Sequence, residues 1–318
     1  MTLVLSTTNV KSDCCFTTSK EEFFFLKKEG KLMNNEKFQE IKSILGTPAF
    51  EADKVAIYQM DCLDAMKKIP DSLVDLTVTS PPYNIGKEYE EISSVDAYIG
   101  WCQRWMKEVY RLTKSDGSFW LNLGFMPVDD KGFAVPIPYL LWDKSDFYFH
   151  QEIVWNYAAG VACKKRFSHR NEKFLWYLKD PKNYTFNLDD VRDPDVKYPN
   201  QKKNGKLRCN PLGKNPSDVW QITKVTSGRN RSSKERTPHP AQFPLALIER
   251  VVKASSNVGD LILDPFMGSG STAECALRND RFSIGFELKS EYIGYAESRI
   301  INFLEDKDAT EKQVELAL

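Results

Sequence analysis

Two consecutive prolines, Pro81 and Pro82, follow a β-branched, apolar segment that is typical of a strand buried on both faces. Proline fixes φ and lacks a backbone donor, so the carbonyl groups of such a rigid turn stay available as acceptors. Ser80 adds a hydroxyl and Tyr83 adds an aromatic ring. A hydroxyl and a carbonyl can accept the two protons of a planar amine while the ring stacks on its heterocycle. The alternative is an ordinary rigid turn, which is the common role of a Pro-Pro pair.

A second group of residues with the types needed for chemistry lies near the end of the chain. Asp264 ends a short apolar segment, Gly268 and Gly270 permit a tight turn, and a second apolar segment ends at Glu287. This spacing indicates a nucleotide-type site, in which backbone amides face the ligand and an acid binds ribose hydroxyls. It lacks the GxGxxG spacing of a dinucleotide site and the lysine of a P-loop. A glycine turn after a strand can also be purely structural.

Both groups need strands that end beside each other, and the sequence alternates between strand and helix patterns. Strands are predicted over residues 54–61, 74–80, 118–123, 152–157, 173–178, 261–263 and 281–286. Helices are predicted over residues 23–26, 36–45, 61–70, 96–113, 137–142, 245–255, 272–278 and 291–304. We expect the charged tail beyond residue 306 to be frayed. The alternation predicts an α/β fold with a doubly wound, mostly parallel sheet.

The formal net charge is zero, but the charge is distributed unevenly. Residues 160–240 hold 19 lysines and arginines against 8 acidic residues, a surplus of 11 positive charges. Within them, residues 180–237 have little periodicity, and their basic and aromatic side chains include Tyr184, Lys202, Lys203, Lys206, Trp220, Arg229, Arg231, Lys234 and Arg236. Such an insertion indicates a surface that binds nucleic acid. The alternative is a flexible, solvated loop without a ligand.

Composition excludes several classes of protein. The hydrophobic content of 42% and the 19 phenylalanines exclude a disordered or fibrous chain. The sequence contains no run of eighteen apolar residues, so no membrane span is predicted. The N-terminus lacks the pattern of a signal peptide. We therefore expect a cytoplasmic protein whose seven cysteines are reduced. Three histidines and no CxxC pair argue against a metal site.

The order of the two groups of residues resembles that of a known family. Ser80-Pro-Pro-Tyr83, followed some 180 residues later by Asp264-Pro-Phe-Met-Gly-Ser-Gly-Ser-Thr272, resembles the S-adenosylmethionine-dependent DNA amino-methyltransferases. It is most similar to their β class, in which the catalytic motif precedes a target-recognition region and then the cofactor motif. The resemblance covers residues 54–303, and the recognition region matches by position only. It implies a Rossmann-like methyltransferase fold with permuted motif order.

The resemblance also implies how the chain is divided. Residues 1–50 are an N-terminal extension, and residues 51–179 are the catalytic half of the methyltransferase domain. Residues 180–237 are the inserted target-recognition region, residues 238–305 the cofactor-binding half, and residues 306–318 a tail.

Individual roles are implied residue by residue. The catalytic turn comprises Ser80, Pro81, Pro82 and Tyr83. The loop that binds the cofactor S-adenosylmethionine comprises Asp264, Pro265, Phe266, Gly268, Gly270, Ser271 and Thr272. Glu287 would hold the ribose hydroxyls, Asp61 would accept from the adenine amino group, and residues 239–244 would cover the methionine end. His169 lies in a motif that flanks the target base and would contact DNA, as would Lys202, Lys203, Lys206, Arg229 and Arg231.

The expected reaction is methyl transfer to an exocyclic amine, for which Ser80 and the Pro81 carbonyl draw the amine towards a tetrahedral nitrogen. No Pro-Cys dipeptide is present, which argues against a cytosine-C5 enzyme with its cysteine nucleophile. Duplex DNA requires the base to be flipped out, with Tyr83 as its stacking partner. In the family, serine at the first motif position accompanies cytosine N4 and aspartate or asparagine accompanies adenine N6, so Ser80 favours cytosine N4.

Several alternatives stay open at this point. An adenine-N6 enzyme of the same fold is the first, and an RNA methyltransferase or a catalytically inactive nucleic-acid-binding protein is the second. The intact Ser80–Tyr83 turn argues against the inactive protein. The expected partner is double-stranded DNA, without a membrane or a metal. A cognate restriction endonuclease and the choice between monomer and homodimer are left open.

Overall fold

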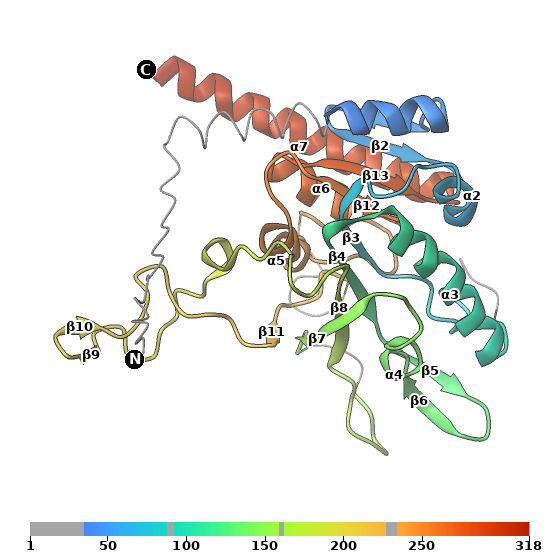
Figure 1. Cartoon of the computed structure of the whole chain (residues 1–318), viewed down its shortest axis with the longest axis horizontal. Helices are drawn as coiled ribbons and strands as arrows, with labels where there is room; N and C mark the ends of the chain where they lie inside the picture. The colour runs from blue at the N-terminus through green and yellow to red at the C-terminus, as the bar shows by residue number, and fades with distance from the viewer. Residues whose placement is uncertain (1–34, 88–91, 159–161, 227–233, 318) are drawn as a thin grey trace, which may run out of the picture.

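The computed structural model describes residues 35–87, 92–158, 162–226 and 234–317 (Figure 1). A nine-stranded sheet forms its centre, in the order β1-β2-β13-β12-β3-β4-β8-β7-β11. These strands are β1 (Phe50–Ala52), β2 (Val55–Tyr58), β3 (Val74–Thr79), β4 (Thr113–Leu123), β7 (Tyr148–Asn156), β8 (Asn171–Leu178), β11 (Val219–Gln221), β12 (Leu261–Asp264) and β13 (Phe282–Phe286). The expected α/β class with a mostly parallel central sheet is confirmed.

The remaining elements are helices and two small hairpins. The helices are a first one over residues 35–45, then α2 (Cys62–Met66), α3 (Val95–Leu112), α4 (Pro138–Leu141), η1 (Leu188–Val191), α5 (Leu245–Ser255), α6 (Ser271–Arg278) and α7 (Ser290–Ala317). The hairpins pair β5 (Phe125–Val128) with β6 (Gly132–Pro136), and β9 (Lys202–Lys203) with β10 (Lys206–Leu207). No helix in the described ranges is long and apolar enough to cross a membrane.

The sheet reverses its winding direction between β12 and β3. From β12 the chain passes through α6 to β13 on one side, and from β3 it passes through α3 to β4 on the other. All four strands are parallel to one another, and β12 pairs directly with β3. In open α/β sheets, ligands bind outside the carboxyl ends of the strands at such a reversal. The fold therefore marks the carboxyl ends of β3 and β12 as the place for a site.

Alternating side chains of the central strands belong to two hydrophobic cores, one on each face of the sheet. Leu261 and Leu263 of β12 face the core that holds Trp105 of α3, whereas Ile262 faces the core that holds Leu247 of α5. This alternation follows from the two-residue period of a strand. Because both faces are covered by helices, the central strands are continuous apolar runs, which explains why their sequence pattern was recognisable.

The prediction that residues 180–237 lack regular structure is wrong in part. Strand β11 joins the main sheet parallel to β7, and Trp220 on β11 is only 7% exposed. Its ring stacks on Trp120 with 5.8 Å between centroids, and Tyr184 packs against the same core. Contrary to the expectation, neither of these two aromatic side chains belongs to a surface that could face nucleic acid. The physical reason is that β11 extends the sheet, so its tryptophan lies over an apolar sheet face that would otherwise be exposed to water.

The expected fraying of the tail is also wrong. Helix α7 continues without a break to Ala317, with a Lys307–Glu311 ion pair at 4.0 Å one turn apart. Residues 307–317 consist largely of Glu, Lys, Asp, Ala, Gln and Leu, and they contain no glycine or proline. Most of these residues have good helix propensity, which outweighs the lack of burial. The helix expected at residues 23–26 lies outside the described residues.

Candidate functional site

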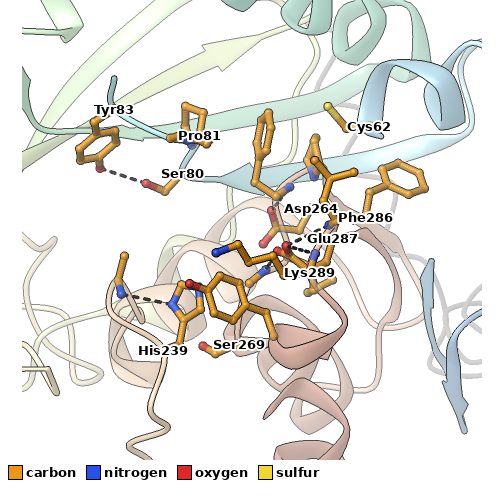
Figure 2. A pocket seen from close by; sticks show the side chains of 18 of the residues that line it. Cys62, Ser80, Pro81, Tyr83, His239, Asp264, Ser269, Phe286, Glu287 and Lys289 are labelled. Atoms are coloured by element: carbon orange, nitrogen blue, oxygen red, sulfur yellow. Dashed lines mark hydrogen bonds between the residues drawn. The ribbon is translucent and has the colours of Figure 1, made fainter. Parts of the chain in front are cut away.

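A cavity of about 620 Å³ opens at the carboxyl ends of β3 and β12. Figure 2 shows Ser80 and Tyr83 at one end of it and Asp264 and Glu287 at the other. The predicted site residues that line it are Asp61, Ser80, Pro81, Pro82, Tyr83, His239, Asp264, Pro265, Phe266, Gly268, Ser271, Thr272 and Glu287. The two motifs recognised in the sequence therefore belong to one cavity. We call its two ends the glycine-loop end (residues 264–270 and Glu287) and the proline-turn end (residues 80–83).

The two ends are joined at their base by one buried hydrogen bond. The Thr79 hydroxyl donates to Oδ1 of Asp264 at 2.6 Å, across 185 residues of sequence. The same carboxylate oxygen accepts from the Phe266 N–H at 3.1 Å, and Asp264 is only 2% exposed. Burial raises the pKa of Asp264 to about 6, although these donors act in the opposite direction. Asp264 thus fixes the tip of β12 against the tip of β3.

At the glycine-loop end, a second acid is held almost entirely by backbone groups. Glu287 follows β13, and its Oε2 accepts from the Gly268 N–H at 2.9 Å. Its Oε1 accepts from the N–H groups of Leu288 and Lys289 at 2.9 and 3.0 Å. Burial raises the pKa of Glu287 above its ordinary value, whereas the three N–H donors favour the charged form. The carboxylate is therefore fixed at the mouth of the glycine loop.

The two glycines of the loop, Gly268 and Gly270, have different structural roles. Gly268 has a φ of +53°, and a Cβ there would lie 3.1 Å from Nε2 of His239. Gly270 has a φ of +76° and a Cβ there would lie 2.7 Å from Cβ of Ala296 on α7. Gly268 lines the cavity, whereas Gly270 lies behind it and permits α6 and α7 to pack closely. A side chain at either position would strain the backbone, but only one at Gly268 would change the wall of the cavity.

Two further predicted residues are placed by local hydrogen bonds. Asp61 caps the start of α2, because its Oδ1 accepts from the N–H groups of Leu63 and Asp64. His239 accepts from the Ala241 N–H through Nδ1 at 3.2 Å, which assigns that ring nitrogen as an acceptor. Its ring stands edge-on to Tyr292 at 4.3 Å, above the glycine loop. Both side chains line the cavity.

At the proline-turn end, the turn over residues 80–83 is held by side chains from other strands. The Ser80 hydroxyl donates to the Tyr83 hydroxyl at 3.0 Å. The Tyr83 hydroxyl lies 2.8 Å from Oδ1 of Asn122 and 3.2 Å from Oε2 of Glu172, and its single proton can be given to one of them at a time. Burial, with the charge of Glu172, holds the pKa of Tyr83 well above its ordinary value. The tyrosine is thus a neutral link between Ser80 and a carboxylate.

The far side of this network reaches the inserted region. Lys224 lies 2.6 Å from Oε1 of Glu172, and its ammonium stands over the ring of Tyr157 at 3.8 Å. The basic character of residues 180–237 predicts a surface that binds nucleic acid, and it gives no sign of this ion pair. No local pattern could have revealed it, because 52 residues separate Lys224 from Glu172.

Helix α3 supplies wall residues that sequence reasoning also missed. The Tyr98 hydroxyl donates to the Pro82 carbonyl at 2.8 Å, so this carbonyl already has a partner. The Pro81 carbonyl has no hydrogen bond to another described residue, and Pro81 lines the cavity. Trp101, one turn after Tyr98, packs on Phe266 with 5.5 Å between ring centroids. The spacing of these aromatic residues on the helix was the available signal, but it did not show which face they occupy.

Of the residues predicted to bind DNA, those that the structure describes lie outside the cavity. Lys202, Lys203 and Lys206 are exposed on the β9–β10 hairpin, which extends away from the sheet (Figure 1). His169 is exposed and its ring packs on Phe125 at 4.4 Å. Arg229 and Arg231 lie outside the described residues. Among the described side chains, no group of three or more His, Cys, Asp or Glu is arranged to hold a metal ion.

A doubly wound sheet whose central strand tips carry a glycine loop, a fixed acid and a facing proline turn is typical of enzymes that bind a nucleotide-type cofactor. Comparison with known proteins narrows this class. A family model for N6/N4 methyltransferases, described as DNA methylase, matches residues 74–298. The chain therefore belongs to this DNA methylase family, and it is a DNA methyltransferase.

Individual relatives agree with this assignment. The chain is 61% identical over 261 residues to the type II methyltransferase M.ScaI of Streptomyces caespitosus, covering 82% of this chain and 86% of that protein. It is 36% identical over 255 residues to the DNA adenine methyltransferase YhdJ of Escherichia coli (strain K12), covering 77% and 82%. The solved structure of the cytosine-N4-specific PvuII DNA methyltransferase has the same fold, with a TM-score of 0.61 and 23% identity over 80% of this chain and 88% of that chain.

Proposed function

We propose that this protein is a β-class, site-specific DNA methyltransferase that transfers a methyl group from S-adenosylmethionine to N4 of a cytosine flipped out of duplex DNA. The observation that carries the proposal is the single cavity in which Ser80 faces the glycine-loop end. The Ser80 hydroxyl can accept an amine proton of the target base, and the glycine loop suits the nucleoside of the methyl donor. Both therefore lie within reach of the two reactants when these are bound together in the cavity. In-line transfer between them needs this proximity.

The residues at the glycine-loop end fit S-adenosylmethionine. Glu287 stands beside the Gly268 N–H, where a carboxylate can accept from ribose hydroxyls. Asp61 engages its backbone partners through Oδ1, which leaves Oδ2 to accept from the adenine amino group. Asp264 and His239 line the remaining wall, towards the methionine end. When bound, this cofactor supplies a methyl group activated by a positively charged sulfur.

At the proline-turn end, the protein acts on the amine. The Ser80 hydroxyl and the Pro81 carbonyl accept the two amine protons, which concentrates the nitrogen lone pair towards the methyl carbon. A carbon–nitrogen bond forms as the carbon–sulfur bond breaks, and one amine proton is released. The hydrogen-bonded chain from Ser80 through Tyr83 to Glu172 offers that proton a route to a carboxylate. The other oxygen of this carboxylate lies 2.6 Å from the Lys224 ammonium.

The choice of cytosine rests on Ser80, since serine at this motif position accompanies N4 methylation in the family. Adenine N6 is the second candidate, and the 36% identity to the adenine methyltransferase YhdJ favours it. The test is to incubate purified protein with duplex DNA and the cofactor, digest the DNA to nucleosides, and identify the methylated nucleoside by mass. N4-methyl-2′-deoxycytidine is expected; N6-methyl-2′-deoxyadenosine would move the assignment to the second candidate. Methylated RNA with unmethylated DNA would contradict the proposal.

We also propose that methylation protects DNA from a cognate restriction endonuclease, because the 61% identical relative is a type II methyltransferase. Plasmid from cells that express the chain should resist one or a few enzymes of a restriction panel. Plasmid from cells that express a Ser80→Ala variant is the control and should be cut by all of them. Cleavage of both plasmids by every enzyme would contradict protection at the sites tested.

A further inference from the structure

A fully exposed phenylalanine stands at the edge of the catalytic side of the sheet. Phe167 lies in the loop between β7 and β8 and is 99% exposed. Strand β7 is parallel to β4, because both are antiparallel to β8, and β4 is parallel to β3. The carboxyl end of β7, where this loop begins, therefore lies at the same sheet edge as Ser80 and Asp264.

The loop is shaped by its own hydrogen bonds and braced from one side. Its residues 162–170 are closed by a 3.0 Å hydrogen bond from the Cys163 N–H to the Ser168 hydroxyl, so that Phe167 stands near the tip. Two contacts attach the loop to the β5–β6 hairpin: the Arg166 guanidinium lies 4.0 Å from the ring centroid of Phe133, and His169 packs on Phe125. Both segments extend below the sheet in Figure 1. A loop braced in this way can present an apolar side chain to a partner at low entropic cost.

The brace also connects the loop to the catalytic turn. Gly124, the residue before Phe125, lies against Tyr83, since a Cβ there would be 2.8 Å from Cε2 of that ring. Glu172, which follows the loop, contacts the Tyr83 hydroxyl. The loop that carries Phe167 is therefore linked at its base to the residue proposed to stack on the target base.

The surroundings of Phe167 favour a polyanion. Lys164, Lys165 and Arg166 precede it and are exposed, and Arg170 follows it. No acidic residue occurs between positions 162 and 171. An apolar ring among cations fits a duplex, which offers phosphates outside and stacked bases inside. An anionic membrane offers similar chemistry, but it gives no reason for the loop to stand beside the proline-turn end.

We propose that Phe167 inserts into the DNA duplex at the place vacated by the flipped target base, with Lys164 and Lys165 on the neighbouring phosphates. This inference rests on the proposed function. Flipping a base costs pairing and stacking energy, and an apolar wedge that fills the gap offsets part of that cost. The benefit of Phe167 should therefore appear only when the target base is paired and stacked at the start.

The test compares Phe167→Ala with wild type on two forms of a duplex that wild type methylates. In the first form the target base is normally paired, and in the second it faces an abasic position. Removing a stacking ring should lower kcat/KM on the paired duplex by about 10- to 100-fold. The loss should shrink to within about threefold on the abasic duplex, with unchanged affinity for the methyl donor. Phe167→Trp should retain activity on both.

A matched control is Tyr148→Ala. Tyr148 is a 53% exposed tyrosine at the start of β7, at the opposite end of that strand from the loop. It should leave kcat/KM on both duplexes unchanged. Wild-type kcat/KM for Phe167→Ala on the paired duplex, or an equal loss on both duplexes, would overturn the wedge. If no duplex DNA is found that the wild-type protein methylates, the proposed function itself fails. Binding of wild type but not Phe167→Ala to anionic phosphatidylserine vesicles, with normal methylation by the variant, would assign the loop to membranes instead.

Discussion

At the glycine-loop end of the cavity, Glu287 accepts hydrogen bonds from three backbone N–H groups. At the proline-turn end, Tyr83 is held by the side chains of Ser80, Asn122 and Glu172, which come from three different parts of the chain. Backbone N–H donors are present for any side chain except proline, so the glycine-loop end depends on the conformation of its backbone. Few substitutions of its glycines should therefore be tolerated. The second end depends on the identity of each side chain. The two ends should therefore fail in different ways when they are mutated.

The largest effect is expected at the proline-turn end. Ser80→Ala removes one acceptor for the target amine, and the loss of one preorganised hydrogen bond in a transition state costs about 2.7–4 kcal/mol, or about 10²–10³ in rate. Single-turnover methyl transfer should fall by this factor, while donor affinity measured by calorimetry stays unchanged. Ser298→Ala, at an exposed serine on α7, is the control. A normal transfer rate would remove Ser80 from the mechanism and with it the main reason for favouring cytosine N4.

The opposite pattern is expected at the glycine-loop end. Gly268→Val puts a β-branched residue at a φ of +53° and a Cβ against the His239 ring. Donor affinity should fall by about 100-fold while the fold, followed by circular dichroism, stays largely intact. Gly294→Ala is the matched control, because a Cβ at Gly294 meets nothing within 4 Å. Unchanged donor affinity for Gly268→Val would contradict the assignment of this loop to the cofactor.

A smaller effect should separate the side-chain network from the turn itself. Glu172→Gln keeps the shape but removes the charge that contacts Tyr83 and Lys224. We expect single-turnover transfer to slow by about tenfold, since a hydrogen bond to a charged group contributes about 1.5–3 kcal/mol and one to a neutral group about 0.5–1.5 kcal/mol. Glu152→Gln, which breaks a 3.3 Å pair with Lys173 on the same sheet, should leave the rate unchanged. Equal rates for wild type and Glu172→Gln would show that the network only positions the tyrosine.

Binding of the methyl donor at the glycine-loop end should also depend on pH. Burial raises the pKa of Asp264 to about 6 from its ordinary value of 3.8. Affinity for the cationic donor should fall below about pH 6, by up to about tenfold per pH unit, because Asp264 then carries a proton. Folding stability moves the other way: the contribution of Asp264 is fully present below pH 3.8 and is lost as the pH rises through about 6. Calorimetry from pH 5 to 8 tests this, and Asp264→Asn should flatten the profile of donor affinity.

The smallest effect concerns a region that belongs to neither end. Replacing Lys202, Lys203 and Lys206 by alanine should weaken DNA binding and reduce its salt dependence by about one slope unit for each phosphate that is no longer neutralised. Donor affinity and the transfer rate at saturating DNA should not change. An unaltered salt slope in a titration from low to moderate salt would show that the β9–β10 hairpin is only a solvated loop.

The same contrast explains what could be predicted from the sequence. The glycine-loop end is made by residues close together in the chain, and its strands are buried on both faces, so apolar runs and glycine spacing located Asp264, Gly268 and Glu287. The proline turn was visible for the same reason. Its partner Glu172 lies 89 residues from Tyr83, and no periodicity connects them. Trp220 was misread because a single aromatic residue in a polar stretch gives no sign of whether a sheet face nearby is uncovered.

The hydrogen bond between Thr79 and Asp264 has a consequence for the synthesis of the chain. At about 5–20 residues per second, roughly 9–37 s pass between the emergence of these two residues from the ribosome. During that interval β3 lacks its neighbour β12, and an unpaired strand edge of this kind is prone to aggregation. Closing a loop of 185 residues also makes this pairing a late and slow folding event. A nascent or truncated chain that ends before β12 would therefore hold an intact proline turn with no wall opposite it.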